Sequence, residues 1–131
     1  MSNNKYCVND CEGTGINFRT EYITQIAAVV LENKSNELKT FNSLVRSPKS
    51  IPPNIEDLTG IKSEDVLRAP DFQDVYTRFV EFIEDTVLIT QAGYEYDVPL
   101  LEQHCENECQ ECSKVIRNWC ESGFVKLNTS M

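Results

Sequence analysis

The sequence has 131 residues, with 12 lysines and arginines against 21 aspartates and glutamates, so its formal net charge is −9. This length predicts one domain spanning residues 1–131, and 40% hydrophobic with 25% charged residues is typical of a globular chain rather than a disordered one. The acid excess argues against nucleic-acid binding unless metal ions bridge the charges.

The sequence also argues against secretion and membrane insertion. No apolar run approaches the roughly 18 residues of a membrane helix, and residues 1–5 (MSNNK) show no signal-peptide pattern. We therefore expect an intracellular protein, in the nucleus or the cytoplasm, with no membrane partner. The six cysteines are accordingly expected to be reduced thiols.

The first half of the chain predicts three strands. Tyr6–Val8 begins a short strand that continues to a glycine turn at residues 13–15. Tyr22–Leu31 is β-branched and mostly apolar, as in a central strand, and Leu38–Arg46 alternates in the manner of a third antiparallel strand. These segments predict an antiparallel meander.

The second half alternates helices with strands. Pro52 and Pro53 lead into a short helix that ends at Gly60, and a longer amphipathic helix follows Pro70, with Asp71 as its cap. The remaining elements are expected to be a strand at Thr86–Thr90, a helix within Asp97–Trp119 and a last strand within Gly123–Asn128. This order indicates an α/β layer fold with a mixed sheet.

Two carboxylates near the start of the chain suggest chemistry. Asp10 and Glu12 are two residues apart in a strand, so both side chains project from one face, and Cys11 points the other way. Hard carboxylate oxygens at a strand end suit Mg²⁺ or Mn²⁺, and the small residues that follow would let a ligand approach the backbone. The alternative is an exposed acidic pair at a turn.

Several stretches resemble one known family in the same order and with similar spacing. Residues 9–15 (NDCEGTG) resemble the first motif, F-D-x-E-T-T-G, of the DEDD-type 3′–5′ exonucleases of the DEDDh class, and residues 89–101 (ITQAGYEYDVPLL) resemble the second motif. In the animal three-prime repair exonucleases, the members that this chain resembles most, the second motif is close to V-A-H-N-G-x-x-Y-D-x-P-L-L. The intervening matches are residues 23–29, 41–45, 51–52, 58–61 and 69–72. The resemblance covers nearly the whole chain.

The resemblance implies a ribonuclease H-like fold, in which a three-stranded antiparallel meander and parallel strands form a mixed sheet with flanking helices. It also implies hydrolysis at the 3′ ends of DNA or RNA by two metal ions, Mg²⁺ or Mn²⁺. The family's metal ligands correspond to Asp10, Glu12 and Asp97. Gly13, Thr14 and Gly15 would line the pocket for the terminal nucleotide.

The family's third motif, H-x-A-x-x-D, supplies a general base and a fourth carboxylate, and no stretch of the 131 residues matches it. The fold is therefore expected to be C-terminally truncated relative to the family. The single histidine, His104, is expected to be a partly exposed helix residue rather than a substitute base. Gln91 and Ala92 replace a His-Asn pair, Asn128 replaces an aspartate, and Gly13 replaces a threonine. Together these departures predict little or no exonuclease activity.

Four cysteines lie close together near the end of the chain, namely Cys105, Cys109, Cys112 and Cys120. The Cys109-x-x-Cys112 spacing is compatible with a zinc site. On one helix, however, the four would span about 22 Å, too far for one tetrahedral ion. We favour a buried apolar stripe, with zinc binding and redox sensitivity as the alternatives.

Three functions remain open from the sequence. The first is a 3′–5′ exonuclease-like enzyme of weak or no activity, and the second is a degenerate exonuclease fold that serves as a nucleic-acid-binding or interaction module. The third is a zinc-binding adaptor through the cysteine cluster. An uncovered apolar face of the sheet would favour a homodimer.

Overall fold

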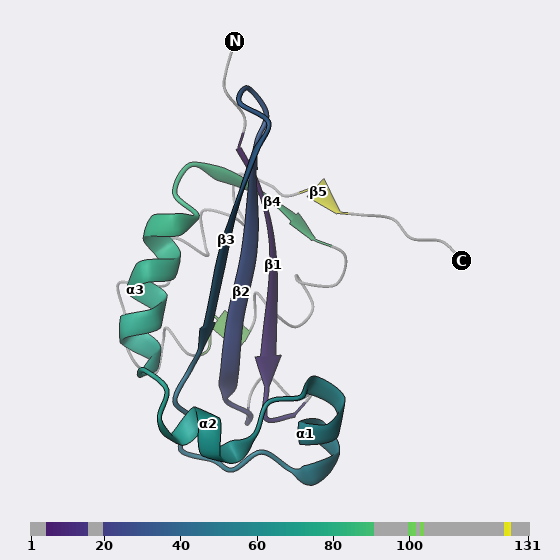
Figure 1. Cartoon of the computed structure of the whole chain (residues 1–131), viewed down its shortest axis with the longest axis vertical. Helices are drawn as coiled ribbons and strands as arrows, with labels where there is room; N and C mark the ends of the chain where they lie inside the picture. Colours follow the sequence, from purple (N-terminus) through teal and green to yellow (C-terminus); the bar gives the residue numbers. More distant parts are fainter. Residues whose placement is uncertain (1–4, 16–19, 91–99, 102, 104–124, 127–131) are drawn as a thin grey trace, which may run out of the picture.

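The computed structural model describes residues 5–15, 20–90, 100–101, 103 and 125–126. Its helices and strands, in chain order, are β1 (Lys5–Gly13), β2 (Ile23–Glu32), β3 (Glu37–Leu44), α1 (Pro53–Thr59), α2 (Ser63–Leu67), α3 (Phe72–Phe82), β4 (Thr86–Thr90) and β5 (Val125–Lys126). Within this described part, the strands form one sheet in the order β3-β2-β1-β4-β5 (Figure 1).

The sheet is mixed, as the sequence predicts. β1 pairs antiparallel with β2, and β2 pairs antiparallel with β3, so the first three strands form the expected meander. β4 pairs parallel with β1, and β5 pairs parallel with β4. β1 is therefore the central strand of the sheet, and it ends at Gly13.

One face of the sheet carries the main core. Cys7 and Cys11 of β1, Ile26 of β2 and the helix α3 pack together on this face, and Leu100 and Leu101 join the same cluster. Burial raises the pKa of the Cys7 thiol to about 12, although a hydrogen bond with Thr86 partly offsets this effect. Cys7 is therefore a protonated core residue at neutral pH, as expected for a small buried hydrophobe.

Helix α3 lies along the core face of the sheet (Figure 1). Asp71 accepts a hydrogen bond from the backbone N–H of Asp74, so it caps the helix as predicted. The buried residues of the helix are Phe72, Val75, Tyr76 and Phe79. Each such side chain contributes about 1.5–3 kcal/mol on burial, so this face accounts for much of the stability of the sheet–helix unit.

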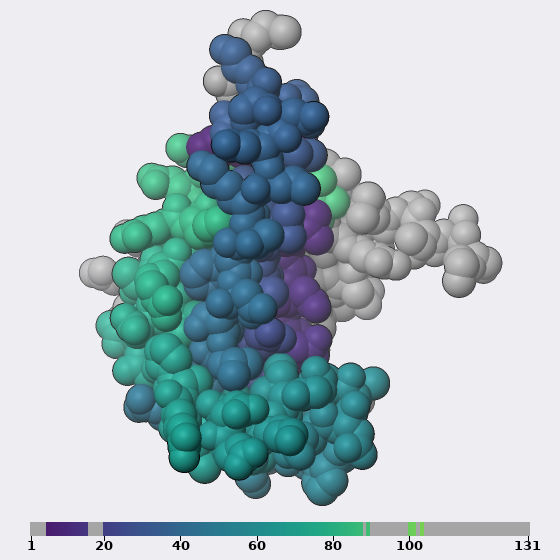
Figure 2. Space-filling view, viewed as in Figure 1, coloured from purple at the N-terminus to yellow at the C-terminus, as the bar shows by residue number. Residues whose placement is uncertain are grey.

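The short helices α1 and α2 lie beyond the end of the meander at which β1 and β3 terminate (Figure 1), and their residues form the teal end of the molecule in Figure 2. They enclose a second apolar cluster of Ile51, Ile61 and Val66. Gly60 ends α1 as predicted, because it adopts a left-handed φ of 76° and its N–H donates to the carbonyl of Glu56 at 2.8 Å. This small unit holds the segment after β3 against the ends of the strands.

The sequence-based element boundaries are mostly confirmed. β4 matches the predicted Thr86–Thr90, but β3 ends at Leu44 rather than at Arg46, because the N–H of Arg46 donates to the carbonyl of Pro70 instead. Helix α2 was not predicted, since five residues without a side-chain cap leave no periodic signal. Of the helix expected within Asp97–Trp119, Leu100, Leu101 and Gln103 are described and are helical. No helix among the described residues is long and apolar enough to cross a membrane.

Asn9 is a buried polar residue on the core face of β1. The residue is 8% exposed, and Nδ2 reaches the Cys11 sulfur at 4.0 Å. Within the described part of the chain, Oδ1 has no hydrogen-bond partner. We expect Asn9→Val to stabilise the protein by about 1–2 kcal/mol, because it removes an unsatisfied buried oxygen. Urea unfolding would show a higher midpoint. Thr14→Val, which removes a buried hydroxyl that is fully hydrogen-bonded, is the matched control and should lower the midpoint. A lower midpoint for Asn9→Val would contradict this interpretation.

Candidate functional site

The strand β1 places Asp10 and Glu12 on the face of the sheet opposite the core. Cys7, Asn9 and Cys11 are buried on one side, whereas Asp10 is exposed and Glu12 is half-buried on the other. Both carboxylates lie within the last four residues of β1, before the chain turns away at Gly13. The predicted arrangement of two carboxylates on one face at a strand end is therefore confirmed.

The surface beside Asp10 is hollow. Asp10 faces Ala27 across the β1–β2 pair, and Ala27 in turn faces Asn42 of β3. Because the alanine side chain is short, a shallow hollow of about 360 Å³ lies over these strands, with Asp10 and Asn42 on its lining. The hollow leaves room for a ligand next to the exposed carboxylate.

Glu12 carries an electrostatic penalty. Its partial burial, and secondly the charge of Asp10, raise the pKa of the Glu12 carboxyl above its ordinary value. Both effects disfavour the ionised form of this carboxyl. A bound cation would reverse that preference, because it would neutralise the repulsion between Asp10 and Glu12.

These two residues fit a hard divalent cation. Mg²⁺ and Mn²⁺ prefer carboxylate oxygens and commonly use one or two of them, with water and substrate phosphate oxygens in the other positions. The described residues contain no group of three acidic, cysteine or histidine side chains that could hold an ion together. Asp97, the third ligand predicted from the sequence, lies outside the described residues.

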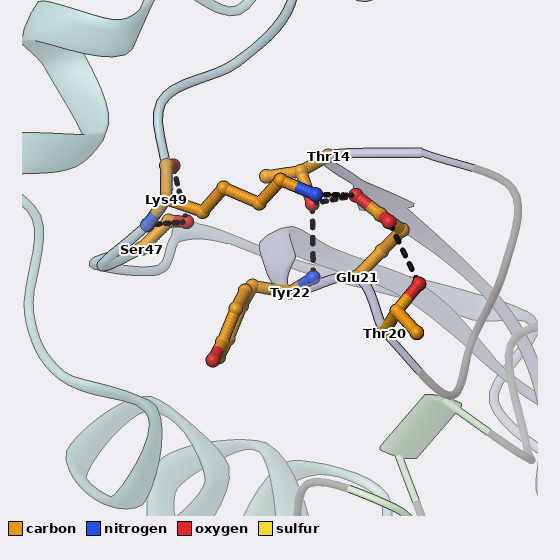
Figure 3. Close-up of polar contacts among 6 residues, drawn as sticks. All are labelled: Thr14, Thr20, Glu21, Tyr22, Ser47 and Lys49. Carbon is orange, nitrogen blue, oxygen red and sulfur yellow. Dashed lines mark hydrogen bonds and ion pairs between the residues drawn. The ribbon is translucent and has the colours of Figure 1, made fainter.

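The loop after β1 is anchored by Thr14. Its side chain is only 1% exposed, and its Oγ1 donates to Glu21 Oε1 at 2.8 Å and accepts from the backbone N–H of Tyr22 at 3.0 Å (Figure 3). The backbone N–H of Thr14 also donates to the Tyr22 carbonyl at 2.9 Å. Gly15 lets Glu21 pack closely on the loop, because a Cβ at this position would lie 2.9 Å from Cγ of Glu21 and would force that side chain to shift.

Glu21 connects this loop to a third segment. Lys49, which follows β3, forms an ion pair with Glu21 Oε1 at 2.7 Å, and Thr20 donates to Oε2 at 2.9 Å. The hydrogen bonds from Lys49, Thr14 and Thr20 hold the pKa of the Glu21 carboxyl below its ordinary value. Sequence reasoning missed this network. The available signal was an acidic residue directly before the second strand, with a lysine after the third.

The remaining predicted site residues lie outside the described part of the chain. They are Asp97, His104 and the cysteines Cys105, Cys109, Cys112 and Cys120. The zinc and core-stripe interpretations of the cysteine cluster therefore stay predictions. The structure brings together Asp10, Glu12 and the loop of Gly13–Gly15, which are consecutive along β1 and its exit.

Comparison with known proteins identifies the family. The family model described as Exonuclease (RNase_T) matches residues 7–128 of this chain, so the chain belongs to the exonuclease family. Similar curated proteins include a 3′–5′ exonuclease DinG of Staphylococcus epidermidis, 31% identical over 101 residues and 77% of this chain, but over 11% of its own length. The DNA polymerase III subunit epsilon of Treponema pallidum is 28% identical over 70% of this chain and 42% of its own length. The chain thus spans less than half the length of these relatives.

Solved structures support the fold. A full-length 3′-exonuclease superposes with a TM-score of 0.68 and 20% identity over 82% of this chain and 40% of its own. E. coli Exonuclease I in complex with an oligonucleotide gives a TM-score of 0.67 at 12% identity, over 79% of this chain and 24% of its own. At these identities the likeness concerns the fold, and it confirms the predicted ribonuclease H-like architecture.

The raised pKa of Glu12 predicts that the folding stability depends on pH, and a cation bound at Glu12 would change that dependence. Because folding raises this pKa, the folded state holds the proton more tightly, and stability is lost as the pH rises through the carboxyl range. At pH 7 and without divalent ions, we expect Glu12→Gln to melt about 1–3 °C above the wild type, a difference that disappears toward pH 4. Mn²⁺ should raise the melting temperature of the wild type but not of the variant.

Differential scanning fluorimetry across pH, with and without Mn²⁺, measures both effects. Glu37→Gln removes one exposed charge near the far end of β3 and should change neither the pH profile nor the response to Mn²⁺. A Glu12→Gln protein that melted below the wild type at pH 7 would contradict the repulsion, and an equal response to Mn²⁺ would contradict the metal site.

Proposed function

We propose that residues 1–131 form one exonuclease-like domain that binds the 3′ ends of DNA or RNA and hydrolyses them slowly with divalent cations. The observation that carries this proposal is the pair Asp10 and Glu12, which share one face of β1 beside a hollow in a chain of the exonuclease family. The raised pKa of Glu12 supports a site that is completed by positive charge.

The proposed ligands are Asp10, Glu12 and Asp97, and two Mg²⁺ or Mn²⁺ ions would lower the pKa of the attacking water and stabilise the leaving 3′ oxygen. Asp10, the more exposed carboxylate, would be shared between the two ions, and Glu12 would hold the ion on the side of the nucleophile. The loop Gly13–Gly15 would seat the terminal nucleotide with its backbone, since the Thr14 side chain is buried and its hydroxyl is already hydrogen-bonded.

The proposed hydrolysis is slow because these 131 residues contain no H-x-A-x-x-D motif to supply a base and a fourth carboxylate. A positioned general base contributes about 10²–10⁴-fold to such reactions. Binding of the 3′ end does not need that base. Nucleic-acid binding should therefore persist where hydrolysis is weak. If hydrolysis is absent altogether, the same proposal describes a degenerate exonuclease fold that serves as a nucleic-acid-binding module.

The test separates binding from hydrolysis. With Mn²⁺ present, we expect a fluorescently labelled single-stranded oligonucleotide with a free 3′ hydroxyl to bind in an anisotropy assay, and Asp10→Ala to weaken binding about tenfold or more. Gel analysis of the same mixtures should show 3′ trimming that is slow or undetectable. Asp65→Ala, an exposed carboxylate on α2, is the control and should bind as the wild type does.

Two outcomes would contradict the proposal. Absence of any binding that depends on Asp10 would contradict the 3′-end site. Rapid trimming that Asp10→Ala abolishes would contradict the expected slow hydrolysis and would show that the 131 residues hold a complete catalytic set.

We propose a homodimer as a second state of the chain, distinct from the state that binds a 3′ end. Val8, Val29, Leu31 and Leu38 are exposed large hydrophobic residues on the face of the sheet that carries Asp10. Covering them with the same face of a second copy would remove apolar surface from water. It would also cover the hollow beside Asp10, whose lining includes Val8 and Val29, so the dimer and a bound 3′ end would exclude each other. Size-exclusion chromatography over a range of concentrations should show a dimer that Val29→Lys shifts to the monomer. A monomer at all concentrations would contradict it.

The sequence likeness to the animal three-prime repair exonucleases and an intracellular location, in the nucleus or the cytoplasm, complete the proposal. The names of the relatives, a 3′–5′ exonuclease and a DNA polymerase subunit, support a role in nucleic-acid processing. Imaging of the tagged full-length gene product in its own cells would establish the location.

A further inference from the structure

Three segments meet at the exit of β1, and the third is distant in sequence from the other two. They are the loop after β1 with Thr14, the residues Thr20–Tyr22 that lead into β2, and the segment after β3 with Ser47 and Lys49 (Figure 3). Glu21 is the residue that all three share. Its Oε1 accepts from Thr14 and from Lys49, and its Oε2 accepts from Thr20.

The contacts form a chain that ends in the candidate nucleotide loop. Lys49 Nζ donates to Glu21 Oε1 at 2.7 Å, and the hydroxyl of Thr14 donates to the same oxygen at 2.8 Å. Thr14 lies two residues after Glu12, between the two glycines of the loop. The hydroxyl of Thr14 has both its hydrogen-bonding roles occupied, one by Glu21 and one by the Tyr22 N–H, so Glu21 fixes the loop together with the Tyr22 backbone.

Lys49 is itself fixed at its backbone. Its N–H donates to Ser47 Oγ at 3.2 Å, and Ser47 Oγ donates back to the carbonyl of Lys49 at 2.7 Å. Ser47 is buried, and the preceding Val45 donates its N–H to the carbonyl of Thr24 in β2 at 2.8 Å. The lysine is thus presented from a turn that the sheet holds in place.

The charges matter as much as the hydrogen bonds. The Glu21 side chain is 13% exposed and packs closely on the loop, since a Cβ at Gly15 would lie 2.9 Å from its Cγ. An unpaired carboxylate at this place would repel an anionic nucleotide bound at the same loop. Lys49, whose side chain is 46% exposed, neutralises it and leaves the loop without a net charge from this pair.

We propose that Glu21 and Lys49 are positioning residues, which fix the Gly13–Gly15 loop in the conformation that receives a 3′-terminal nucleotide and shield that nucleotide from the Glu21 charge. This inference rests on the function proposed above. It assigns to the pair an effect on nucleotide affinity rather than on the fold, because partly exposed ion pairs contribute little to stability.

The test uses the 131-residue protein, thymidine 5′-monophosphate as the probe and Mn²⁺ as the ion, with titration calorimetry for each. We expect Lys49→Met to weaken binding of the mononucleotide about tenfold, through the loss of loop positioning and of the charge shield. The affinity for Mn²⁺ without nucleotide should stay within about twofold, because Asp10 and Glu12 are untouched. Lys49→Arg, which keeps the charge and the donors, should restore nucleotide binding.

Two further variants separate the contributions and the controls. Glu21→Gln keeps an oxygen for Thr14 but removes the charge, so it should weaken nucleotide binding less than Glu21→Ala, which removes both. Lys34→Met removes an equivalent charge in the turn between β2 and β3, at the other end of the meander, and should bind as the wild type does (Figure 1).

The outcomes distinguish this inference from the proposed function. If the wild type binds the mononucleotide and Lys49→Met binds it equally well, the positioning role is overturned and the proposed function stands. If Lys49→Met loses affinity for Mn²⁺ and nucleotide alike, a general loosening of the fold explains the loss, and the positioning role is overturned as well. If the wild type binds no nucleotide, the proposed function fails and this inference fails with it.

Discussion

The structure depends on the alternation of side chains along β1 at the centre of the sheet. Its odd-numbered residues from Cys7 to Cys11 lie in the core beneath α3, and Asp10 and Glu12 lie on the opposite face. A slip of one residue in the pairing with β2 would place both carboxylates in the core and the thiols on the surface. The free energy of burying the core therefore also fixes the direction in which the candidate ligands point.

The core and the site are linked through the ends of the same strands. β1 ends at Gly13, β2 begins at Ile23 and β3 ends at Leu44, all at the end of the sheet near α1 and α2. Where the chain leaves the sheet at the ends of the strands, its backbone N–H and C=O groups lose their partners in the sheet and need others nearby. The network around Glu21 does so with side chains, and it thereby holds the loop next to the carboxylates in one position.

Much of this arrangement could be predicted from the sequence. The meander, the cap at Asp71, the left-handed Gly60 and the shared face of Asp10 and Glu12 follow from local periodicity and turn chemistry, which a single sequence displays. The pairing of Glu21 with Lys49 could not be predicted, because the two residues are 28 positions apart. They meet only because β3 pairs antiparallel with β2, which brings the end of β3 next to the start of β2. The buried Oδ1 of Asn9, which has no hydrogen-bond partner among the described residues, could not be predicted either, because its cost in stability depends on which face of β1 is buried.

Two glutamates close to the exit of β1 show how the same side chain serves different purposes. Glu21 has a lysine and two hydroxyls as partners, and its pKa is lowered, so its charge is already compensated within the fold. Glu12 faces a second carboxylate and partial burial, and its pKa is raised. Among the described residues, the fold supplies a lysine to Glu21 and no positively charged partner to Glu12, at a cost in stability. The proposed bound cation would supply the positive charge and offset that cost, and under that proposal the Asp10–Glu12 pair serves a ligand rather than the fold.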